Sequence, residues 1–548
     1  MKKLILSSIL IFTIYTGNLY AQSSQDFKLN KNVDIFFSAL RELRSVYVDS
    51  LNIDDLFHSS IEGMISKLDP YTTFVPEEEA GEFDFMTTGR YGGIGALIQK
   101  DSNYVRIAEP YKGFPAQQAG LVAGDRLIQI DGQDLKDADI NSVSNMLKGN
   151  PGTTVELKAV KLRGSDTVSL KLKRQRIHVS GIVYAGIIDD GIGYIRLTSF
   201  TEDCSRDFRD ALTNLRKTGD LKSLIIDLRS NGGGLFEESI KIVNFFVPKG
   251  TEVVSARGRE KSFEATYLTK DQSIDTQIPI AVLVNSATAS SSEVVSGAIQ
   301  DLDRGIIVGT RTFGKGYIQA IRPTGYNTKM KITSAKYYIP SGRCIQAHNF
   351  SQLNSDGSVA FIPDSLKKEF KTKTGRKVFD GGGIDPDIKV ESEEYSRIAV
   401  SLVSRNLIFE YSLKYYKEHL AIVEPKDFKI TNEDYADFVN FLFDKTYDYQ
   451  TTSERIFKQL TEAVKNEKYD SETKIEMDAL SEKLKHDKLK DLQIFKPEIS
   501  QLLEAEIVNR YYYQEGRVCS MLRNDIQLDS AVKVLKNPVE YNNILSKQ

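Results

Sequence analysis

The residues most able to do chemistry in this chain are a run of serines and a lysine that follows it. The run is Asn285-Ser-Ala-Thr-Ala-Ser-Ser-Ser-Glu293, and the lysine lies between two glycines in Thr312-Phe-Gly-Lys-Gly316. A serine hydroxyl becomes a nucleophile when a base removes its proton, but an ordinary lysine, with a pKa of about 10.4, is protonated at pH 7. Burial lowers the pKa of a lysine by several units. The pattern therefore indicates serine chemistry with a buried lysine as the base.

Two other interpretations of these residues fail. Gly309-Thr-Arg-Thr-Phe-Gly-Lys-Gly316 has the spacing of a phosphate-binding loop, but a glycine follows the lysine where Ser or Thr must hold magnesium. A Ser-His-Asp triad needs a histidine in a suitable motif, and no histidine of this chain lies in one. The five are His58, His178, His348, His419 and His486. They also lack metal-ligand spacing with the cysteines, so we expect no metal and no cofactor.

The elements around the serine run alternate between strand and helix from Gly193 to Ile345. The pattern predicts strands at 223–229, 278–285 and 305–309, helices at 235–246 and 290–302, and a glycine turn at Ser230-Asn-Gly-Gly-Gly234. Such βαβ units predict an α/β core with a mainly parallel sheet. The serine run then lies where a buried strand meets a helix N-terminus, whose free N–H groups and positive dipole stabilise an oxyanion.

The segment from Gly92 to about Arg176 has short strands and glycine turns instead. Gly92-Gly-Ile-Gly95 and the longer string from Ala119 to Gly132 resemble a PDZ domain. Gly93, Ile94 and Gly95 take the place of the loop whose backbone N–H groups hold a peptide's terminal carboxylate, while a strand edge pairs with the peptide. A small β domain without that role is the alternative.

The chain begins with Met1-Lys2-Lys3, an apolar run to Tyr15 and small residues up to Ala21, which is the order of a secretory signal. The apolar run is too short for a membrane span, so we expect cleavage and export to the periplasm or cell envelope. The predicted ranges are 1–21 signal peptide, 26–88 N-terminal helical region, 89–178 PDZ-like domain, 179–390 α/β core with an insertion or mobile loop at 349–377, and 391–548 C-terminal helical domain.

Composition sets further bounds. The 548 residues are 41% hydrophobic with a net charge of -3, which allows a large core and gives no electrostatic reason to expect nucleic acid as a partner. Three cysteines far apart, Cys204, Cys344 and Cys519, predict small buried residues rather than a disulfide framework.

Four strings together resemble the carboxyl-terminal processing (tail-specific) serine peptidases with a PDZ domain. They are Asp227-Leu-Arg-Ser-Asn-Gly-Gly-Gly234, Ala289-Ser-Ser-Ser-Glu293, Gly297-Ala-Ile-Gln-Asp301 and Thr312-Phe-Gly-Lys-Gly-Tyr-Ile-Gln319. The resemblance implies an α/β multidomain protein with a core related to the crotonase and Clp protease folds, an inserted-type PDZ-like β domain, and helical N- and C-terminal regions.

The resemblance also implies roles for single residues. Ser290 corresponds to the nucleophile, Lys315 to the general base and Gln319 to the group that orients the lysine. The register depends on Glu293, because Ser291 replaces the usual alanine and three serines are adjacent. The N–H of Ser291 corresponds to one oxyanion donor, and the second comes from Gly233 or its neighbour Gly232.

The expected function is that of an exported serine endopeptidase that cuts proteins near their C-terminus through an acyl-enzyme. Its partners would be proteins or peptides with accessible C-termini, membrane-associated ones included, captured by the PDZ-like domain. The alternative is a non-catalytic, peptide-binding envelope scaffold. Retention of Ser290, Lys315, Gln319 and the glycine turn together favours the enzyme, because a scaffold does not need them.

Overall fold

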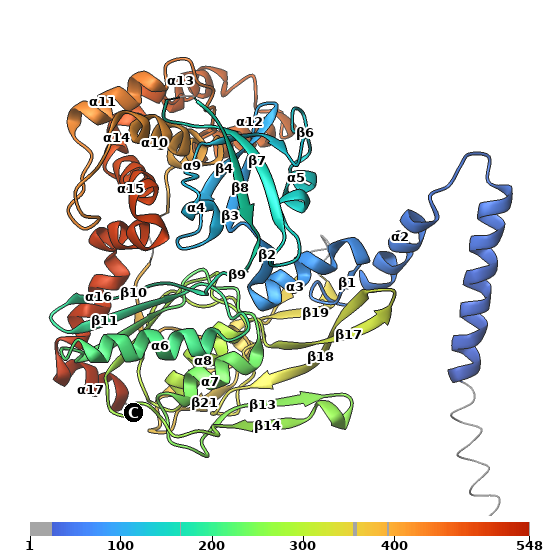
Figure 1. The fold of residues 1–548 in the computed structure, drawn as a ribbon. Helices are drawn as coiled ribbons and strands as arrows, with labels where there is room; N and C mark the ends of the chain where they lie inside the picture. Colours follow the sequence, from blue (N-terminus) through green and yellow to red (C-terminus); the bar gives the residue numbers. More distant parts are fainter. Residues whose placement is uncertain (1–24, 165, 354–358, 392–393, 547–548) are drawn as a thin grey trace, which may run out of the picture. The chain divides into compact units, whose positions relative to one another are not determined.

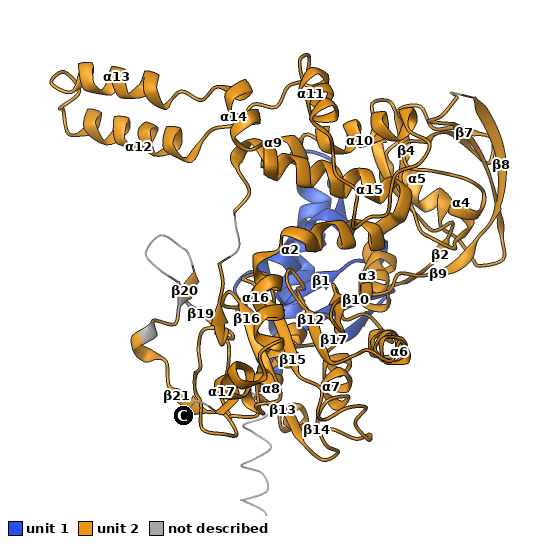
Figure 2. Cartoon of the chain, turned by 90° about the vertical axis from the view of Figure 1, so that its left-hand side faces the viewer, with its two compact units in different colours: residues 1–78, 321–332 blue, residues 79–320, 333–548 orange. Residues whose placement is uncertain are grey.

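The computed structural model describes residues 25–164, 166–353, 359–391 and 394–546. The predicted signal peptide lies outside these ranges. The chain divides into two compact units, residues 1–78 with 321–332 and residues 79–320 with 333–548 (Figure 2). Within the described ranges, no helix combines the length and apolar character that a membrane span requires.

The first unit is mainly helical. Residues 25–46 form a helix, and α2 (Ile53–Ile65) begins after Asn52, whose side chain caps it. The chain then turns at Asp69, because this carboxylate accepts hydrogen bonds from two following N–H groups. The strand β1 (Thr73–Val75) pairs antiparallel with residues 329–331.

The second unit begins with η1 (Glu77–Glu79), whose last residue belongs to it, and α3 (Ala80–Thr88), and continues into the PDZ-like segment. The sheet of this segment has the order β3-β4-β5-β7-β8, with β6 beside β5. Its elements are β3 (Ala96–Asp101), β4 (Tyr104–Pro110), α4 (Pro115–Gln118), β5 (Arg126–Ile130), β6 (Gln133–Asp134), α5 (Ile140–Leu147), β7 (Thr154–Val160) and β8 (Thr167–Lys173). The chain enters and leaves through one antiparallel pair, β2 (Arg90–Gly93) and β9 (Gln175–His178).

A six-stranded sheet of order β10-β11-β12-β15-β16-β23 forms the α/β core. Its first two strands, β10 and β11, are labelled in Figure 1. The strands are β10 (Ile182–Asp189), β11 (Ile192–Leu197), β12 (Ser223–Asp227), β15 (Ile280–Val284), β16 (Ile306–Gly309) and β23 (Ile388–Lys389). Every neighbouring pair except β10–β11 is parallel, which confirms the prediction of a mainly parallel sheet.

Successive residues of these strands face opposite sides of the sheet, as strand geometry requires. Ile226 and Val282 pack with α6 (Cys204–Lys217), α7 (Phe236–Asn244) and α8 (Ser291–Asp301). Ile225 and Leu283 instead pack with α16 (Ile526–Leu535) and α17 (Pro538–Ser546). The last two helices of the region 391–548 therefore cover one face of the α/β core, which the sequence pattern did not indicate.

Four further strands belong to a second sheet. They are β13 (Glu252–Gly258), β14 (Ala265–Leu268), β17 (Tyr317–Gly325) and β18 (Thr328–Tyr338), with η2 (Lys261–Phe263) after β13. In this sheet β18 pairs with β1, β13 and β17, and β13 pairs with β14. The segment 349–377 contains short strands and one turn of helix in its described part. They are β19 (His348–Leu353), β20 (Val359–Phe361), η3 (Asp364–Leu366), β21 (Glu369–Lys371) and β22 (Lys377–Phe379). Its mobility stays a prediction.

The C-terminal helices have an apolar core of their own. Its helices are α9 (Arg397–Ser404), α10 (Leu407–Glu418), α11 (Asn432–Phe441), α14 (Lys488–Ile494) and α15 (Lys496–Met521), which η4 (Leu522–Asn524) follows. Thr431 caps α11, since its hydroxyl accepts a hydrogen bond from the N–H of Asp434. The hairpin α12 (Thr452–Asn466) and α13 (Lys474–Leu484) has no buried residue.

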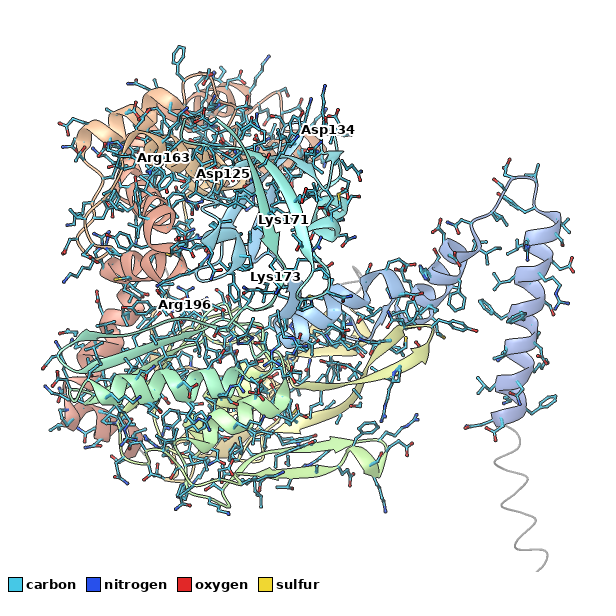
Figure 3. The ribbon with its side chains drawn as sticks, viewed as in Figure 1. Asp125, Asp134, Arg163, Lys171, Lys173 and Arg196 are labelled. Carbon is cyan, nitrogen blue, oxygen red and sulfur yellow. The ribbon has the colours of Figure 1, made fainter. Side chains whose placement is uncertain are left out.

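The PDZ-like segment is joined to these helices by several polar contacts. Arg163, labelled in Figure 3, donates to the carbonyl oxygens of Tyr416 and His419, and its guanidinium lies 3.9 Å from the centre of the Tyr416 ring. Arg510 on α15 donates to the carbonyl oxygen of Ala108 over 3.0 Å. These contacts fix the segment against α10 and α15.

Candidate active site

The glycine turn and the serine run meet at the carboxyl end of the sheet. The turn follows β12, and Ser290 lies between β15 and α8. Gly233 has a φ of 100°, and a Cβ at this position would lie 2.8 Å from the Cβ of Ser290. No side chain fits in that space, so glycine is required for both its conformation and its close approach. The structure thus brings the predicted turn directly against the predicted nucleophile.

The three adjacent serines have different surroundings. The hydroxyl of Ser291 donates to the carbonyl oxygen of Gly234 at 3.0 Å, and that of Ser292 to the carbonyl oxygen of Asn231 at 3.0 Å. Both side chains are buried. Ser290 is partly exposed, and it forms a capping box with Glu293 at the start of α8. Two of the hydroxyls therefore anchor the glycine turn, while the Ser290 side chain caps the helix.

The backbone of Ser290 is strained. Its φ of 57° and ψ of -117° lie outside the regions that residues with a side chain normally adopt. Such a conformation costs about 1–3 kcal/mol and persists only where the surroundings enforce it. The strain is what a sharp strand-to-helix turn needs in order to present a nucleophile.

The carboxylate of Glu293 enforces this conformation. Its Oε2 accepts hydrogen bonds from the N–H groups of Ser290 at 2.8 Å and Lys315 at 2.9 Å. Its Oε1 accepts from the hydroxyl of Thr312 at 2.6 Å and the N–H of Gly314 at 2.7 Å. One fully buried side chain thus ties the backbone of the predicted nucleophile to that of the predicted base.

Burial has a clear effect on Glu293. Desolvation raises the pKa of this carboxyl to about 7, although the four hydrogen bonds favour the charged form and pull the other way. The group consequently titrates near neutral pH in the folded protein.

Tyr337 on β18 makes a second tie between the same two residues. Its hydroxyl lies 3.1 Å from the carbonyl oxygen of Ser290 and 2.6 Å from that of Lys315. Gln319 lies on β17, four residues after Lys315 on an extended chain, and its side-chain amide donates to the hydroxyl of Thr333 at 3.4 Å. The predicted nucleophile, base and orienting residue therefore come from neighbouring segments.

The predicted oxyanion donors are placed as follows. Ser291 is the first residue of α8, so its N–H has no partner inside the helix. The N–H of Gly233 donates to the side-chain oxygen of Asn231 at 2.9 Å. That of Gly232 forms no hydrogen bond within the described residues. In this arrangement Gly232 has the freer N–H, and Gly233 must leave Asn231 before it can bind an oxyanion.

A buried ion pair lies immediately before the turn. The carboxylate of Asp227, fully buried at the end of β12, accepts from the guanidinium of Arg229 at 2.7 Å and from the hydroxyl of Tyr194 at 2.5 Å. Burial alone would raise the pKa of Asp227, but the pair with Arg229 outweighs it and holds the pKa below its usual range. Arg229 also pairs with Asp525, 2.6 Å away.

The loop predicted to bind a peptide carboxylate lies between β2 and β3. Ile94 is buried, and Gly95 has a φ of 75° with no room for a side chain beside Phe114. In the sheet of this segment β3 is an edge strand, and β4 is its only neighbour among the described strands. A loop next to such an edge is the geometry that strand addition by a peptide requires.

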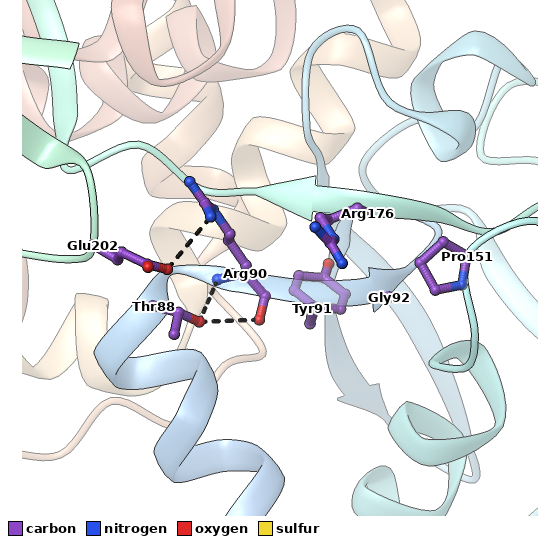
Figure 4. A pocket seen from close by; sticks show the side chains of 7 residues that line it. All are labelled: Thr88, Arg90, Tyr91, Gly92, Pro151, Arg176 and Glu202. Carbon is purple, nitrogen blue, oxygen red and sulfur yellow. Dashed lines mark hydrogen bonds and ion pairs between the residues drawn. The ribbon is translucent and has the colours of Figure 1, made fainter. Parts of the chain in front are cut away.

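A pocket of about 360 Å³ lies at the β2–β9 pair (Figure 4). It is lined by Thr88, Arg90, Tyr91, Gly92, Pro151, Arg176 and Glu202. Arg90 forms ion pairs with Glu202 at 3.4 Å and with Asp203. The pocket therefore lies where the PDZ-like segment joins the α/β core.

Sequence reasoning gave no role to three of these residues. Glu293 was part of a recognised string, and its place in the first turn of a helix was the only signal that it could act on the backbone before it. Tyr337 and Asp525 carried no local signal, because each reaches the site from a distant part of the chain.

Comparisons with known proteins give a consistent result. Three family models match the chain: Peptidase family S41 over residues 191–359, PDZ domain over 106–161, and the C-terminal helical domain of probable PDZ-proteases over 398–535. The second match confirms the PDZ prediction. The first covers both the glycine turn and the serine run.

Individual proteins are also similar. The chain is 34% identical over 319 residues to the carboxy-terminal-processing protease of Bartonella bacilliformis, which covers 58% of this chain and 73% of that protein. It is 32% identical over 386 residues to the carboxy-terminal processing protease CtpA of Bacillus subtilis, covering 70% and 80%. The solved structure of a photosystem II D1 C-terminal processing protease is 27% identical, covering 64% of this chain and 86% of that one, with a TM-score of 0.33.

Proposed function

Because the chain belongs to the carboxy-terminal processing serine peptidases of family S41, we propose that it cleaves exported proteins near their C-terminus with Ser290 as nucleophile and Lys315 as base. It is a serine-type endopeptidase with a PDZ domain and a helical C-terminal region. We also propose that the α/β core has a fold of the crotonase and Clp protease type. Membership of a peptidase family argues against the alternative, a non-catalytic scaffold.

The proposed reaction has two steps. The Nζ of neutral Lys315 takes the proton of the Ser290 hydroxyl, whose oxygen attacks the scissile carbonyl carbon; the new amine leaves with a proton from Lys315, and an acyl-enzyme results. Lys315 then accepts a proton from water, which attacks the ester carbonyl carbon; the bond to the Ser290 oxygen breaks, Lys315 returns the proton to that oxygen, and the new C-terminus is released. Gln319 holds the lysine side chain in the orientation that both transfers need.

The observation that carries the proposal is the shared tie between Ser290 and Lys315. Both N–H groups bind one oxygen of Glu293, at 2.8 and 2.9 Å, and both carbonyl oxygens contact the hydroxyl of Tyr337. These shared bonds keep the two residues at a fixed separation, which is what two side chains need in order to act on one another. The anchored hydroxyls of Ser291 and Ser292 support Ser290 as the nucleophile.

The oxyanion of each tetrahedral intermediate would be bound by backbone N–H groups. We assign the N–H of Ser291 as the first donor, at the positive end of α8, and Gly232 or Gly233 as the second. In the structure as described, the N–H of Gly232 is free, which supports Gly232 as the second donor. Gly233 can be the second donor if the hydrogen bond from its N–H to Asn231 opens.

The PDZ domain would supply the substrate. We propose that a C-terminal strand of the substrate pairs with the edge of β3 while its carboxylate binds the N–H groups of Gly93, Ile94 and Gly95. Envelope proteins with accessible C-termini, membrane-associated ones included, are the proposed substrates. The signal-like residues 1–21 support export to the periplasm or cell envelope.

The experiment uses the mature chain, unfolded reduced and alkylated lactalbumin as substrate, and a fluorophosphonate probe. Cleavage and labelling should be lost in Ser290→Ala, and cleavage should be lost in Lys315→Ala. Ser296→Ala is the control, because its hydroxyl also lies on α8 but bonds only within the helix, to the carbonyl oxygen of Ser292 at 2.9 Å. Label found on Ser291 or Ser292, or cleavage that survives Ser290→Ala, would overturn the assignment.

The role of the PDZ domain needs a separate test. Amidation of the substrate's last residue removes the carboxylate, so cleavage should slow while the labelling of Ser290 stays the same. Equal rates for acid and amide substrates would contradict capture by the carboxylate loop and leave the catalytic assignment intact.

A further inference from the structure

Two side chains from the helix α16 reach the arginine that precedes the glycine turn. The carboxylate of Asp525 lies 2.9 Å from Nη1 and 2.6 Å from Nη2 of Arg229. The amide oxygen of Gln527 lies 3.2 Å from the same Nη1. A carboxylate that binds both terminal nitrogens of a guanidinium fixes its direction as well as its charge.

Asp227 cannot hold this arginine alone. One oxygen of Asp227 accepts both the Nε and the backbone N–H of Arg229, at 3.0 and 2.9 Å. The other accepts Nη2 and the hydroxyl of Tyr194. Asp227 therefore binds one edge of the guanidinium, and the other edge faces α16. Because the Arg229 side chain is only 15% exposed, water cannot replace Asp525 there without cost.

The position of Arg229 bears directly on the turn. The next residue, Ser230, has a φ of 59°, and its N–H donates to the side chain of Asn285 at 2.9 Å. Asn231 then fixes the remainder through its bond to Gly233 and through its carbonyl oxygen, which accepts from the N–H of Ala289 at 3.0 Å. A shift of Arg229 is thus passed along a short chain of bonds to the residues that surround Ser290.

We propose that Asp525 is a positioning residue for peptide hydrolysis, acting through Arg229 to fix the turn from Ser230 to Gly234. This rests on the proposed function. It also gives the helix α16, on the face of the sheet opposite to α8, a part in catalysis. Gln527 supports the same contact, since its amide nitrogen donates to the carbonyl oxygen of Val390 at 2.8 Å and its oxygen is thereby turned toward Arg229.

Asp525 has a second role that the test must separate. Its Oδ1 also accepts the N–H groups of Gln527 and Leu528, at 3.1 and 3.0 Å, and so caps α16. Asparagine caps helices about as well as aspartate. In Asp525→Asn the cap is therefore kept, while the oxygen facing Nη2 of Arg229 becomes an NH₂ group that repels it.

Asp487→Asn is the matched control, because Asp487 caps α14 through the N–H groups of Leu489 and Lys490 and forms no ion pair within the described residues. With the lactalbumin substrate, Asp525→Asn should lower kcat about tenfold with KM changed less than about twofold. In an Arg229→Gln background the same substitution should have no further effect on kcat, because the residue through which it acts is gone. Asp487→Asn should leave both constants unchanged.

A second measurement does not depend on activity. In hydrogen exchange on the full chain, the amides of residues 230–233 should exchange about tenfold faster in Asp525→Asn than in Asp487→Asn, while the thermal midpoints stay alike. Unchanged exchange in the turn overturns the proposal, as does an equal loss of kcat in the Arg229→Gln background. A parent chain that cleaves nothing refutes the proposed function instead, and the exchange experiment then still decides whether Asp525 fixes the turn.

Discussion

Two buried carboxylates with different partners hold the segments around Ser290, which are the serine loop, the lysine loop and the glycine turn. Glu293 holds the serine and lysine loops through three N–H groups and one hydroxyl, all neutral. Asp227 holds the start of the glycine turn through an arginine. Both carboxylates are fully buried at the same end of the sheet. Their different partners show that burial alone does not decide how a carboxylate behaves.

The difference appears in their acidity. Desolvation raises the pKa of Glu293 to about 7, and its neutral donors only partly offset this. Desolvation acts on Asp227 as well, but the charge of Arg229 outweighs it and lowers the pKa. The serine and lysine loops are thus held by Glu293, which titrates near neutrality, and the glycine turn by Asp227, which stays charged.

The largest effect is expected where a charge loses its partner. Asp227→Asn should lower the free energy of unfolding by about 4 kcal/mol, because it leaves the guanidinium of Arg229 mostly buried and under-compensated. Urea denaturation measures this. Asp190→Asn is the control: Asp190 pairs with Lys222 at 2.7 Å on the surface, and its loss should leave the midpoint unchanged. If Asp227→Asn were as mild as the control, the ion pair would not hold this loop.

The pH dependence of stability distinguishes the two carboxylates next. A carboxyl whose pKa is higher in the folded state binds its proton more tightly there, so stability falls as pH rises from about 4.5 to about 7. For Glu293 this fall is about 3 kcal/mol. The lowered pKa of Asp227 has the opposite effect: stability falls as the pH is lowered below about 4, because protonation removes the contribution of this carboxylate.

The contribution of Glu293 can be isolated in Glu293→Gln. The unfolding free energy of the parent should fall by about 3 kcal/mol relative to that of this variant between pH 4.5 and 7, since glutamine does not titrate. Denaturation curves at several pH values measure it. A difference that stays constant with pH would show that Glu293 keeps an ordinary pKa.

Glu293→Gln also tests the tie between nucleophile and base. In either orientation the glutamine amide nitrogen faces at least one N–H donor that now binds a carboxyl oxygen of Glu293, so we expect a loss of about 2 kcal/mol at pH 5 and a fall of about a hundredfold in kcat. Glu238→Gln is the control, because Glu238 is also buried, on α7, but accepts from Ser205 and pairs with Lys241. Equal losses of kcat in both variants would contradict a special role for Glu293.

Much of this arrangement could be predicted from sequence. β12 and β15 are fully buried and contain runs of aliphatic residues, and the glycine turn and serine run follow them in the expected order. Local patterns of this kind report strands, caps and turns. The strain at Ser290 was not visible, because it arises from bonds to Glu293 and Tyr337 rather than from the residue type.

The rest could not be predicted, because it depends on pairing across long separations. Tyr337 reaches Ser290 from 47 residues away, and Asp525 reaches Arg229 from 296 residues away. Charge and hydropathy patterns give no register between such distant segments. For the same reason the sequence indicated a single C-terminal helical domain, whereas α16 and α17 cover the α/β core.

The smallest expected effect concerns the hydroxyl of Ser292, which links the serine run to the glycine turn. Ser292 on α8 donates to the carbonyl oxygen of Asn231 in the glycine turn at 3.0 Å. Ser292→Ala should cost about 1 kcal/mol of unfolding free energy and lower kcat about threefold, because the turn loses one anchor but keeps those from Asn285 and Arg229. Ser296→Ala, equally buried one helical turn later, should leave kcat unchanged. If Ser292→Ala abolished both cleavage and fluorophosphonate labelling, Ser292 rather than Ser290 would be the nucleophile. The roles of Glu293 and Asp227 would then have to be compared by how they position Ser292.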